Sequence, residues 1–181
     1  LAKRFTCITW TFDPLQSPNA YLNFTKLGVI ANDYRINFYG EKTSSALHRF
    51  IGTDRLWVNW FLESERVRKR IERGCDVELS HEELEKHVSL VRMAADGSPR
   101  TRAMVNQDRL LIDVPADIGV LQQQNPELAV AWRNATRAAF TDALDAGYTV
   151  EEFYRIERAG QSAGCYLLNS KTPNGIDQNT K

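Results

Sequence analysis

The chain has 181 residues, enough for one ordinary domain or for a domain with an appendage. Its content of 43% hydrophobic and 10% aromatic residues is typical of a globular protein with a core. The 23 basic residues balance the 23 acidic ones, so no overall field favours nucleic acid or a membrane surface as a partner, and no apolar run reaches the roughly 20 residues of a membrane-spanning helix.

The first 74 residues predict the order strand, helix, strand, strand, helix. Residues 5–12, "FTCITWTF", have strand propensity throughout, are expected to be covered on both faces, and end at an Asp-Pro pair. Ser17 and Pro18 then supply an N-cap and a first-turn proline, and Gly28 has the position of a helix stop. Residues 29–40 predict two short strands, or one strand with a bend at Asn32-Asp33.

Alternating large side chains over residues 54–62 predict the next strand, and residues 63–74 a charged amphipathic helix that ends on glycine. Residues 75–108 are expected to be an irregular connecting segment, in which Ser80 and Glu83 have the spacing of a capping box before a helix that could run through "HEELEKHVSLVRM".

Regular structure returns with a predicted strand over residues 109–115, followed by a short helix. A long helix follows, capped by Asn125 and ended by Gly147, and residues 148–168 predict two strands around a glycine-containing turn. The last dozen residues, 170–181, are expected to be a disordered tail. We therefore predict an α/β fold: a mixed, largely antiparallel sheet with flanking helices, in which residues 109–169 form a strand-helix-hairpin extension packed against the first part.

The cysteines and the N-terminus bear on the compartment. Cys7, Cys75 and Cys165 lack CxxC spacing and no signal peptide precedes the first strand, which indicates reduced thiols in a cytoplasmic protein. Cys7 and Cys165 fall in expected strands and are interpreted as buried, inert thiols. Because the chain begins with Leu1 and enters a strand at once, we expect upstream sequence to be missing.

The segment "NAYLNFTKLGV" resembles the late motif of the GNAT superfamily of acyl-CoA-dependent N-acyltransferases, N-x-x-A-x-x-L-Y-x-K-x-G-F after a strand. Ala20, Lys26 and Gly28 fall at the family's spacing, with Val29 in place of the final Phe. The wider run, with "DPLQ", "KLG", "DRLWVNW" and a later "PELA…WR" helix that ends in "GY", is similar to a poorly characterised branch of predicted GNAT acetyltransferases. The resemblance covers residues 5–168.

This resemblance implies that residues 1–74 are the late half of a GNAT-like domain. Such a domain transfers an acyl group from acetyl-CoA or another acyl-CoA to a small amine, by direct attack on the thioester and without a metal. It also implies cofactor contacts and an acceptor pocket. The cofactor-binding residues would be Asn19, Phe24 and Lys26, and the substrate-binding residues Trp10 and Thr11.

Each of these residues also has an ordinary structural interpretation. Asp13, just past the first strand, is the candidate base or partner of the substrate ammonium, and the alternative is an Asx turn before the proline. Trp10 is equally a core aromatic, and Lys26 a solvated helix lysine. The three histidines lack metal-ligand spacing, so no metal is expected.

The sequence departs from the family pattern in three respects, of which the first two favour a rival function. The CoA-pyrophosphate motif, [QR]-x-x-G-x-[GA], is missing from these 181 residues, Phe24 stands where the family commonly has a proton-donating Tyr, and Ser17 stands where it has Asn. The rival is a non-catalytic GNAT-fold binding or protein-interaction domain. An exposed sheet edge at residues 5–12 further predicts a homodimer.

Overall fold

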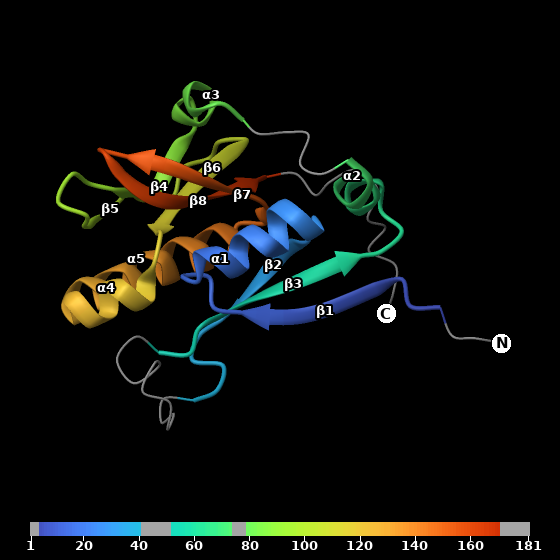
Figure 1. Ribbon diagram of the computed structural model, residues 1–181, viewed down its shortest axis with the longest axis horizontal. Coiled ribbons are helices and arrows are strands. Elements are labelled where there is room, and N and C mark those ends of the chain that lie inside the picture. The colour runs from blue at the N-terminus through green and yellow to red at the C-terminus, as the bar shows by residue number, and fades with distance from the viewer. Residues whose placement is uncertain (1–3, 41–51, 74–78, 171–181) are drawn as a thin grey trace.

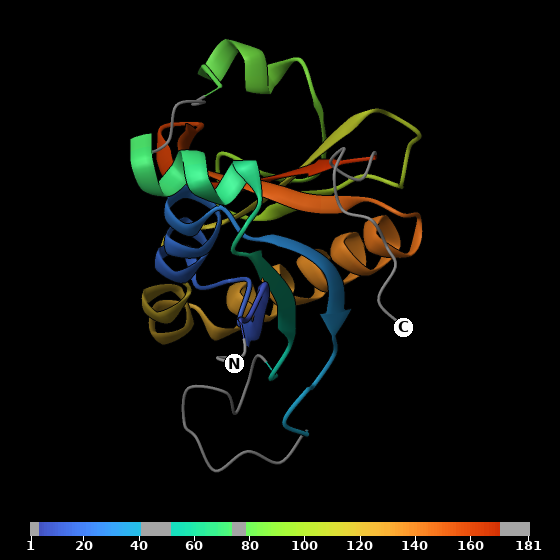
Figure 2. The ribbon, with the colours of Figure 1, turned by 90° about the vertical axis from the view of Figure 1, so that its right-hand side faces the viewer.

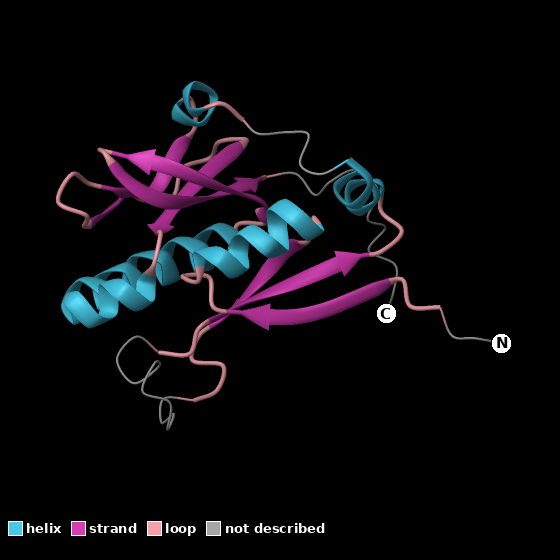
Figure 3. Ribbon diagram, in the orientation of Figure 1, coloured by secondary structure: helices cyan, strands magenta, loops and turns pink. Residues whose placement is uncertain are grey.

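The computed structural model describes residues 4–40, 52–73 and 79–170, which share one eight-stranded sheet (Figures 1 and 3). The strands run in the spatial order β1-β3-β2-β7-β8-β6-β4-β5, and β4 with β6 is the parallel pair among otherwise antiparallel neighbours. The predicted α/β class with a mixed, largely antiparallel sheet is confirmed. The strands are β1 (Cys7–Phe12), β2 (Ile30–Arg35), β3 (Arg55–Phe61), β4 (Val88–Met93), β5 (Pro99–Thr101), β6 (Arg109–Pro115), β7 (Thr149–Arg158) and β8 (Gln161–Asn169).

Helices cover both faces of this curled sheet. The concave side holds a short α-helix that continues directly into a π-helix, together with the long helix α5, whereas α3 lies on the opposite face of β7, β8 and β6 (Figure 2). The helices are α1 (Ser17–Ala20), the π-helix η1 (Tyr21–Leu27), α2 (Glu65–Arg73), α3 (His81–Glu85), α4 (Ile118–Gln124) and α5 (Pro126–Asp145).

Tyr166 of β8 marks the centre of the main core. Its ring meets those of Phe24 from η1, Phe140 from α5 and Phe153 from β7, with centroids 5.7, 5.2 and 4.8 Å away. The early and late parts of the chain therefore share one core as well as one sheet.

A smaller apolar cluster covers the outer face. Leu84 of α3 packs there against Leu111, Tyr154, Cys165 and Leu167. Burial raises the pKa of the Cys165 thiol well above its usual value, so the predicted buried thiol is confirmed at this position. Cys7 is only half-buried, and Cys75 lies outside the described residues.

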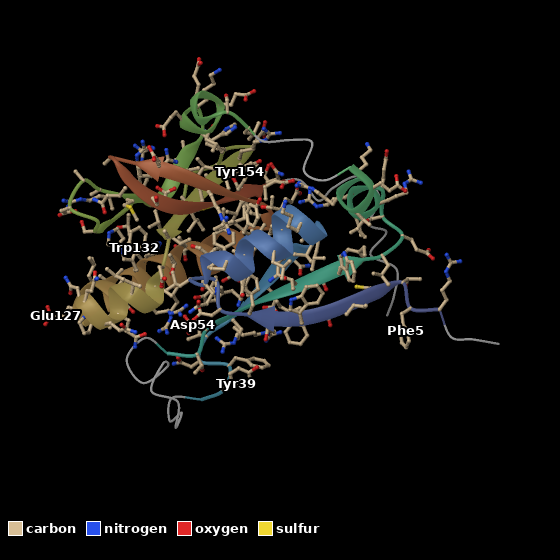
Figure 4. All side chains as sticks on the ribbon, in the orientation of Figure 1. Phe5, Tyr39, Asp54, Glu127, Trp132 and Tyr154 are labelled. Atoms are coloured by element: carbon tan, nitrogen blue, oxygen red, sulfur yellow. The ribbon has the colours of Figure 1, made fainter. Side chains whose placement is uncertain are left out.

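Strand β1 differs from its prediction. We expected cover on both faces, but Ile8 of β1 is 43% exposed, and Phe5, which precedes the strand, is 72% exposed (Figure 4). Strand β1 is also the edge strand and pairs with β3 alone. The exposed sheet edge expected over residues 5–12 is confirmed for β1. Strand β2 has the second of its two predicted forms, one strand with a register shift between Ala31 and Asp33.

The irregular character expected for residues 75–108 is wrong for residues 88–101. The capping box of Ser80 and Glu83 is present, but α3 ends at Glu85, and β4 and β5 follow as a hairpin. Two tertiary contacts explain the order: β4 pairs in parallel with β6, and the Trp132 Nε1 group of α5 donates to the Gly97 carbonyl at 3.0 Å.

Helix boundaries follow the sequence signals with one correction. Ser17 is not the N-cap, which is Gln16. The Ser17 hydroxyl instead donates to the Pro115 carbonyl at 2.7 Å. Gly28 ends η1 in the left-handed conformation, with φ of 71°, as predicted. Asn125 caps α5 by accepting a hydrogen bond from the Leu128 amide at 3.0 Å, also as predicted.

Two expectations concern residues or properties beyond these elements. The predicted tail, residues 170–181, lies outside the described residues except for Ser170. None of the helices in the described part of the chain combines the length and the apolar character needed to cross a bilayer.

Candidate functional site

The sheet opens between β2 and β7. These strands share a single residue pair, Ala31 with Val150, and then diverge, and helix η1 fills part of the gap. The Thr25 hydroxyl donates to the Phe153 carbonyl at 2.6 Å, so this carbonyl points away from β8. By the alternation of an antiparallel strand, the main-chain groups of Arg155 and Glu157 point the same way. The free edge of β7 therefore presents backbone donors to the opening.

Two cavities meet along this edge. The first, here the junction cavity, is about 420 Å³ and lies at the start of α1, lined by Ser17, Pro18, Ala116 and residues of both β7 and β8. The second, the β7 cavity, is about 640 Å³ and lies beside η1, lined by Tyr21, Thr25, Leu84 and the edge of β7. Residues 155–157 line both cavities, so we treat the two as one groove.

The ring of Tyr21, which lines the β7 cavity, makes cation–π contacts with two side chains. The Arg155 guanidinium lies 4.0 Å and the Lys26 ammonium 5.3 Å from the centroid of its ring. Side chains five positions apart do not meet on an α-helix, where residues three or four apart are neighbours. The wider π-helical turn of η1 brings Lys26 to Tyr21, and π-helical turns are frequent at functional sites.

Arg155 and Glu157 are both exposed, and neither takes part in an ion pair among the described residues. By contrast, ion pairs with carboxylates are formed by Arg66, Arg70 and Arg158. The charges on the groove are therefore available to a ligand.

Gly164 of β8 lines the junction cavity. A Cβ atom at this position would lie 2.3 Å from the Phe153 ring and 2.9 Å from Val114. The glycine therefore leaves room for the Phe153 ring to lie over β8, next to Tyr166.

Asp13 lies away from the groove, in a buried ion pair with Arg133 of α5. Its two carboxylate oxygens lie 2.8 and 2.7 Å from the Arg133 Nη2 atom, and the two side chains are 5% and 2% exposed. The Leu15 amide donates to Asp13 at 3.0 Å, so the Asx turn considered as the alternative is present. Because the Asp13 carboxylate already accepts hydrogen bonds from Arg133 and the Leu15 amide, a structural role is favoured over a role as a catalytic base.

A second ion pair continues this buried group. Asp54, with no exposed surface, accepts two hydrogen bonds from Arg137, at 2.8 and 2.9 Å, and one each from Tyr34 and the Asn37 amide (Figure 4). Burial raises the pKa of Asp54, but these hydrogen bonds outweigh burial and lower it. We call the set Asp13, Tyr34, Asp54, Arg133 and Arg137 the α5 cluster.

The predicted cofactor residues lie on α1 and η1 but face different ways. Phe24 is fully buried against Phe12 and Tyr166, so its ring contacts the core rather than either cavity. Asn19 is exposed, and Lys26 is exposed and contacts Tyr21.

The predicted acceptor residues lie on β1, away from the groove. Trp10 packs edge-on against Trp60, with ring centroids 6.3 Å apart, at the border of the main core. Thr11 is half-buried, and as its neighbour in a strand it points to the opposite face. The structure does not bring Trp10 and Thr11 together with Asn19 and Lys26.

The segment that the sequence motifs indicated borders the groove, but most of the residues that line the groove were not predicted. Ser17 and Pro18 stood out as helix signals, whereas Tyr21, Arg155 and Glu157 did not stand out at all. One signal was available: in "EEFYRIER" the face that carries the buried Phe153 continues with Arg155 and Glu157. Charged residues on the core-facing side of a strand indicate that this face opens to solvent or to a ligand.

Neither a group of metal ligands nor a similar protein indicates what the groove binds. In the described ranges no three His, Cys, Asp or Glu side chains are grouped so as to hold a metal ion. Comparison of the chain with protein-family models, with curated proteins and with solved structures found no match in any of the three.

Proposed function

We propose that this chain forms part of an acyl-CoA-dependent N-acyltransferase, and that the thioester and the amine meet in the groove along β7. One observation carries the proposal. The segment of α1 and η1, to which the resemblance assigns the cofactor contacts, borders a cavity whose opposite wall is a free strand edge with outward-facing amides.

The chemistry needs a donor for the thioester carbonyl, whose oxygen becomes negative as the amine attacks. Backbone amides held rigidly in a strand are suited to this task because they need no reorganisation during the reaction. The amides of Arg155 and Glu157 face the groove and have no partner strand on that side, since β2 leaves β7 after Val150. They are the proposed oxyanion donors.

The attacking amine must also lose a proton. Glu157 lines both cavities, is exposed, and has no ion pair within the described residues, so it can accept a proton from an ammonium between the two. We therefore propose Glu157 as the base, in the role that the sequence analysis gave to Asp13.

Turnover and binding measured on the same samples test this proposal. The chain is mixed with millimolar acetyl-CoA or a longer acyl-CoA and with small amines, since weak affinity is expected without the pyrophosphate motif. Released CoA and acylated amine are quantified by chromatography, because a thiol reagent would also react with the half-buried Cys7. Calorimetry on the same preparation measures acyl-CoA binding.

A pair of carboxamide variants locates the base. Glu157→Gln should lower kcat by about 100-fold or more, as expected when a general base is lost, while the protein stays folded. Asp13→Asn should cost stability instead and leave kcat of the folded fraction close to that of the parent. The reverse pattern would return the role of base to Asp13.

The rival is a non-catalytic binding or protein-interaction domain, and two observations favour it: Phe24 cannot donate a proton and is buried, and the Asp13 carboxylate is held by Arg133. Acyl-CoA binding without acylated product would support this rival. Absence of both binding and turnover at millimolar acyl-CoA would overturn the acyltransferase proposal for this chain.

A further inference from the structure

The β7 cavity has a cation and an anion on one edge of its wall. Arg155 and Glu157 are two residues apart on β7, so they project from the same face, with Cα atoms about 6.6–6.8 Å apart. Both line the β7 cavity and the junction cavity. A ligand between them meets one charge of each sign within the length of a small molecule.

The Arg155 guanidinium lies over the ring of Tyr21. Its carbon is 4.0 Å from the centroid of the ring, a cation–π contact that does not use its N–H donors. No carboxylate of the described residues forms an ion pair with it. A guanidinium whose N–H donors are free is suited to bind a carboxylate through two parallel hydrogen bonds.

Part of the remaining wall is apolar. Leu79, Leu84 and Phe153 face the β7 cavity, whose volume of about 640 Å³ is typical of a site for a small organic molecule. Apolar walls with a few convergent charges bind a ligand that has an apolar body and a charged end.

We infer that the β7 cavity binds zwitterionic amines, in which an ammonium and a carboxylate share one end of an apolar body. Arg155 binds the carboxylate, and Glu157 binds the ammonium. As an assignment of the acyl acceptor this rests on the proposed function. It then narrows the acceptor from any small amine to the amino-acid class, with the ammonium beside the proposed base.

Three matched probes test the ligand class in the absence of acyl-CoA. Phenylalanine, phenethylamine and 3-phenylpropionate share one apolar body, but the second lacks the carboxylate and the third lacks the ammonium. Calorimetry should show phenylalanine binding at least about tenfold more tightly than either of the others. Equal affinity for the three probes, or no binding of phenylalanine at millimolar concentration, overturns the inference.

Substitutions on the chain assign the two charges. Arg155→Gln should remove the preference for phenylalanine over phenethylamine, and Arg155→Lys should recover it only in part because an ammonium cannot bind bidentately. Arg102→Gln, at an exposed arginine that lines neither cavity, is the matched control and should keep the preference. Thermal melting of each variant confirms that it folds, and an unchanged preference in folded Arg155→Gln contradicts the assignment.

Glu157→Gln should remove the preference for phenylalanine over 3-phenylpropionate, with Glu72→Gln on the exposed face of α2 as its control. Acyl transfer to phenylalanine and phenethylamine then separates this inference from the proposed function. Transfer to both amines at equal kcat/KM overturns the acceptor class and keeps the acyltransferase. Selective binding of phenylalanine without any transfer keeps the ligand class and overturns the acyltransferase.

Discussion

Arg133 of α5 and Arg155 of β7 are both arginines on main structural elements, but their surroundings differ. Arg133, in the α5 cluster, is 2% exposed and forms an ion pair with Asp13, whereas Arg155 is exposed, makes a cation–π contact with Tyr21 and lines the groove. Buried charges need partners because desolvation is costly, so the α5 cluster is explained by the fold. Arg155 and Glu157 are exposed to solvent and have no ion-pair partner among the described residues, so the fold does not explain their place on the groove.

The largest effect in this comparison is expected for Arg133→Gln. Removal of one member of a buried ion pair leaves the Asp13 carboxylate buried without its guanidinium, which should lower the free energy of unfolding by about 3–5 kcal/mol. Urea denaturation followed by circular dichroism measures this loss. The double variant Asp13→Asn/Arg133→Gln should lose less than Arg133→Gln, and an equal loss would mean that the pair is not what stabilises this region.

The next effect concerns Asp54, whose contribution should depend on pH. Its pKa is lowered in the folded state, so its stabilisation is present above the unfolded value of about 3.9 and is lost as pH falls through the lower folded value. Asp54→Asn should cost about 1.5–3 kcal/mol at pH 7. Denaturation from pH 7 down to pH 2.5 checks this, and a gap between variant and parent that stays constant would contradict it.

A smaller loss is expected for Gly164→Ala, which tests the wall of the groove. The added methyl group would overlap the Phe153 ring, and such overpacking typically costs about 1–3 kcal/mol. Phe153→Leu combined with Gly164→Ala should recover part of the loss by removing the clash. If Gly164→Ala alone has the same denaturation midpoint as the parent protein, Phe153 does not pack closely against Gly164.

The smallest effect on stability is expected for Arg155→Gln, the same substitution as in Arg133. Among the described residues, the interaction that this change removes is the contact with Tyr21, at a cost of about 0.5–1 kcal/mol or less. The same denaturation experiment applies, and a loss comparable to that of Arg133→Gln would show that Arg155 stabilises the fold rather than a ligand.

Local signals predicted most of the elements because each depends on residues close in sequence. The capping box at Ser80, the cap at Asn125 and the stop at Gly28 all hold, since their hydrogen bonds join groups a few positions apart. The strand over residues 88–93 was missed because its stability comes from pairing with β6, about 20 residues away.

The candidate site was predictable only in part, for the same reason. The segment of α1 and η1 stood out through its proline, its glycine and a resemblance in spacing, and it does border the groove. Asp13 stood out as an acidic residue after a strand, but its partner, Arg133, lies 120 positions away, and no local pattern reveals that pairing.

The sequence by itself determined the α/β class, the order of the first five elements and the ends of the main helices, through propensity, alternation and capping. The tertiary structure alone decided that β2 and β7 part after one residue pair, that α1 continues as the π-helix η1 from Tyr21 onward, and that Arg155 and Glu157 line two adjoining cavities. Those features arise where distant strands and a helix meet, so they depend on packing between elements rather than on the residues of any one of them.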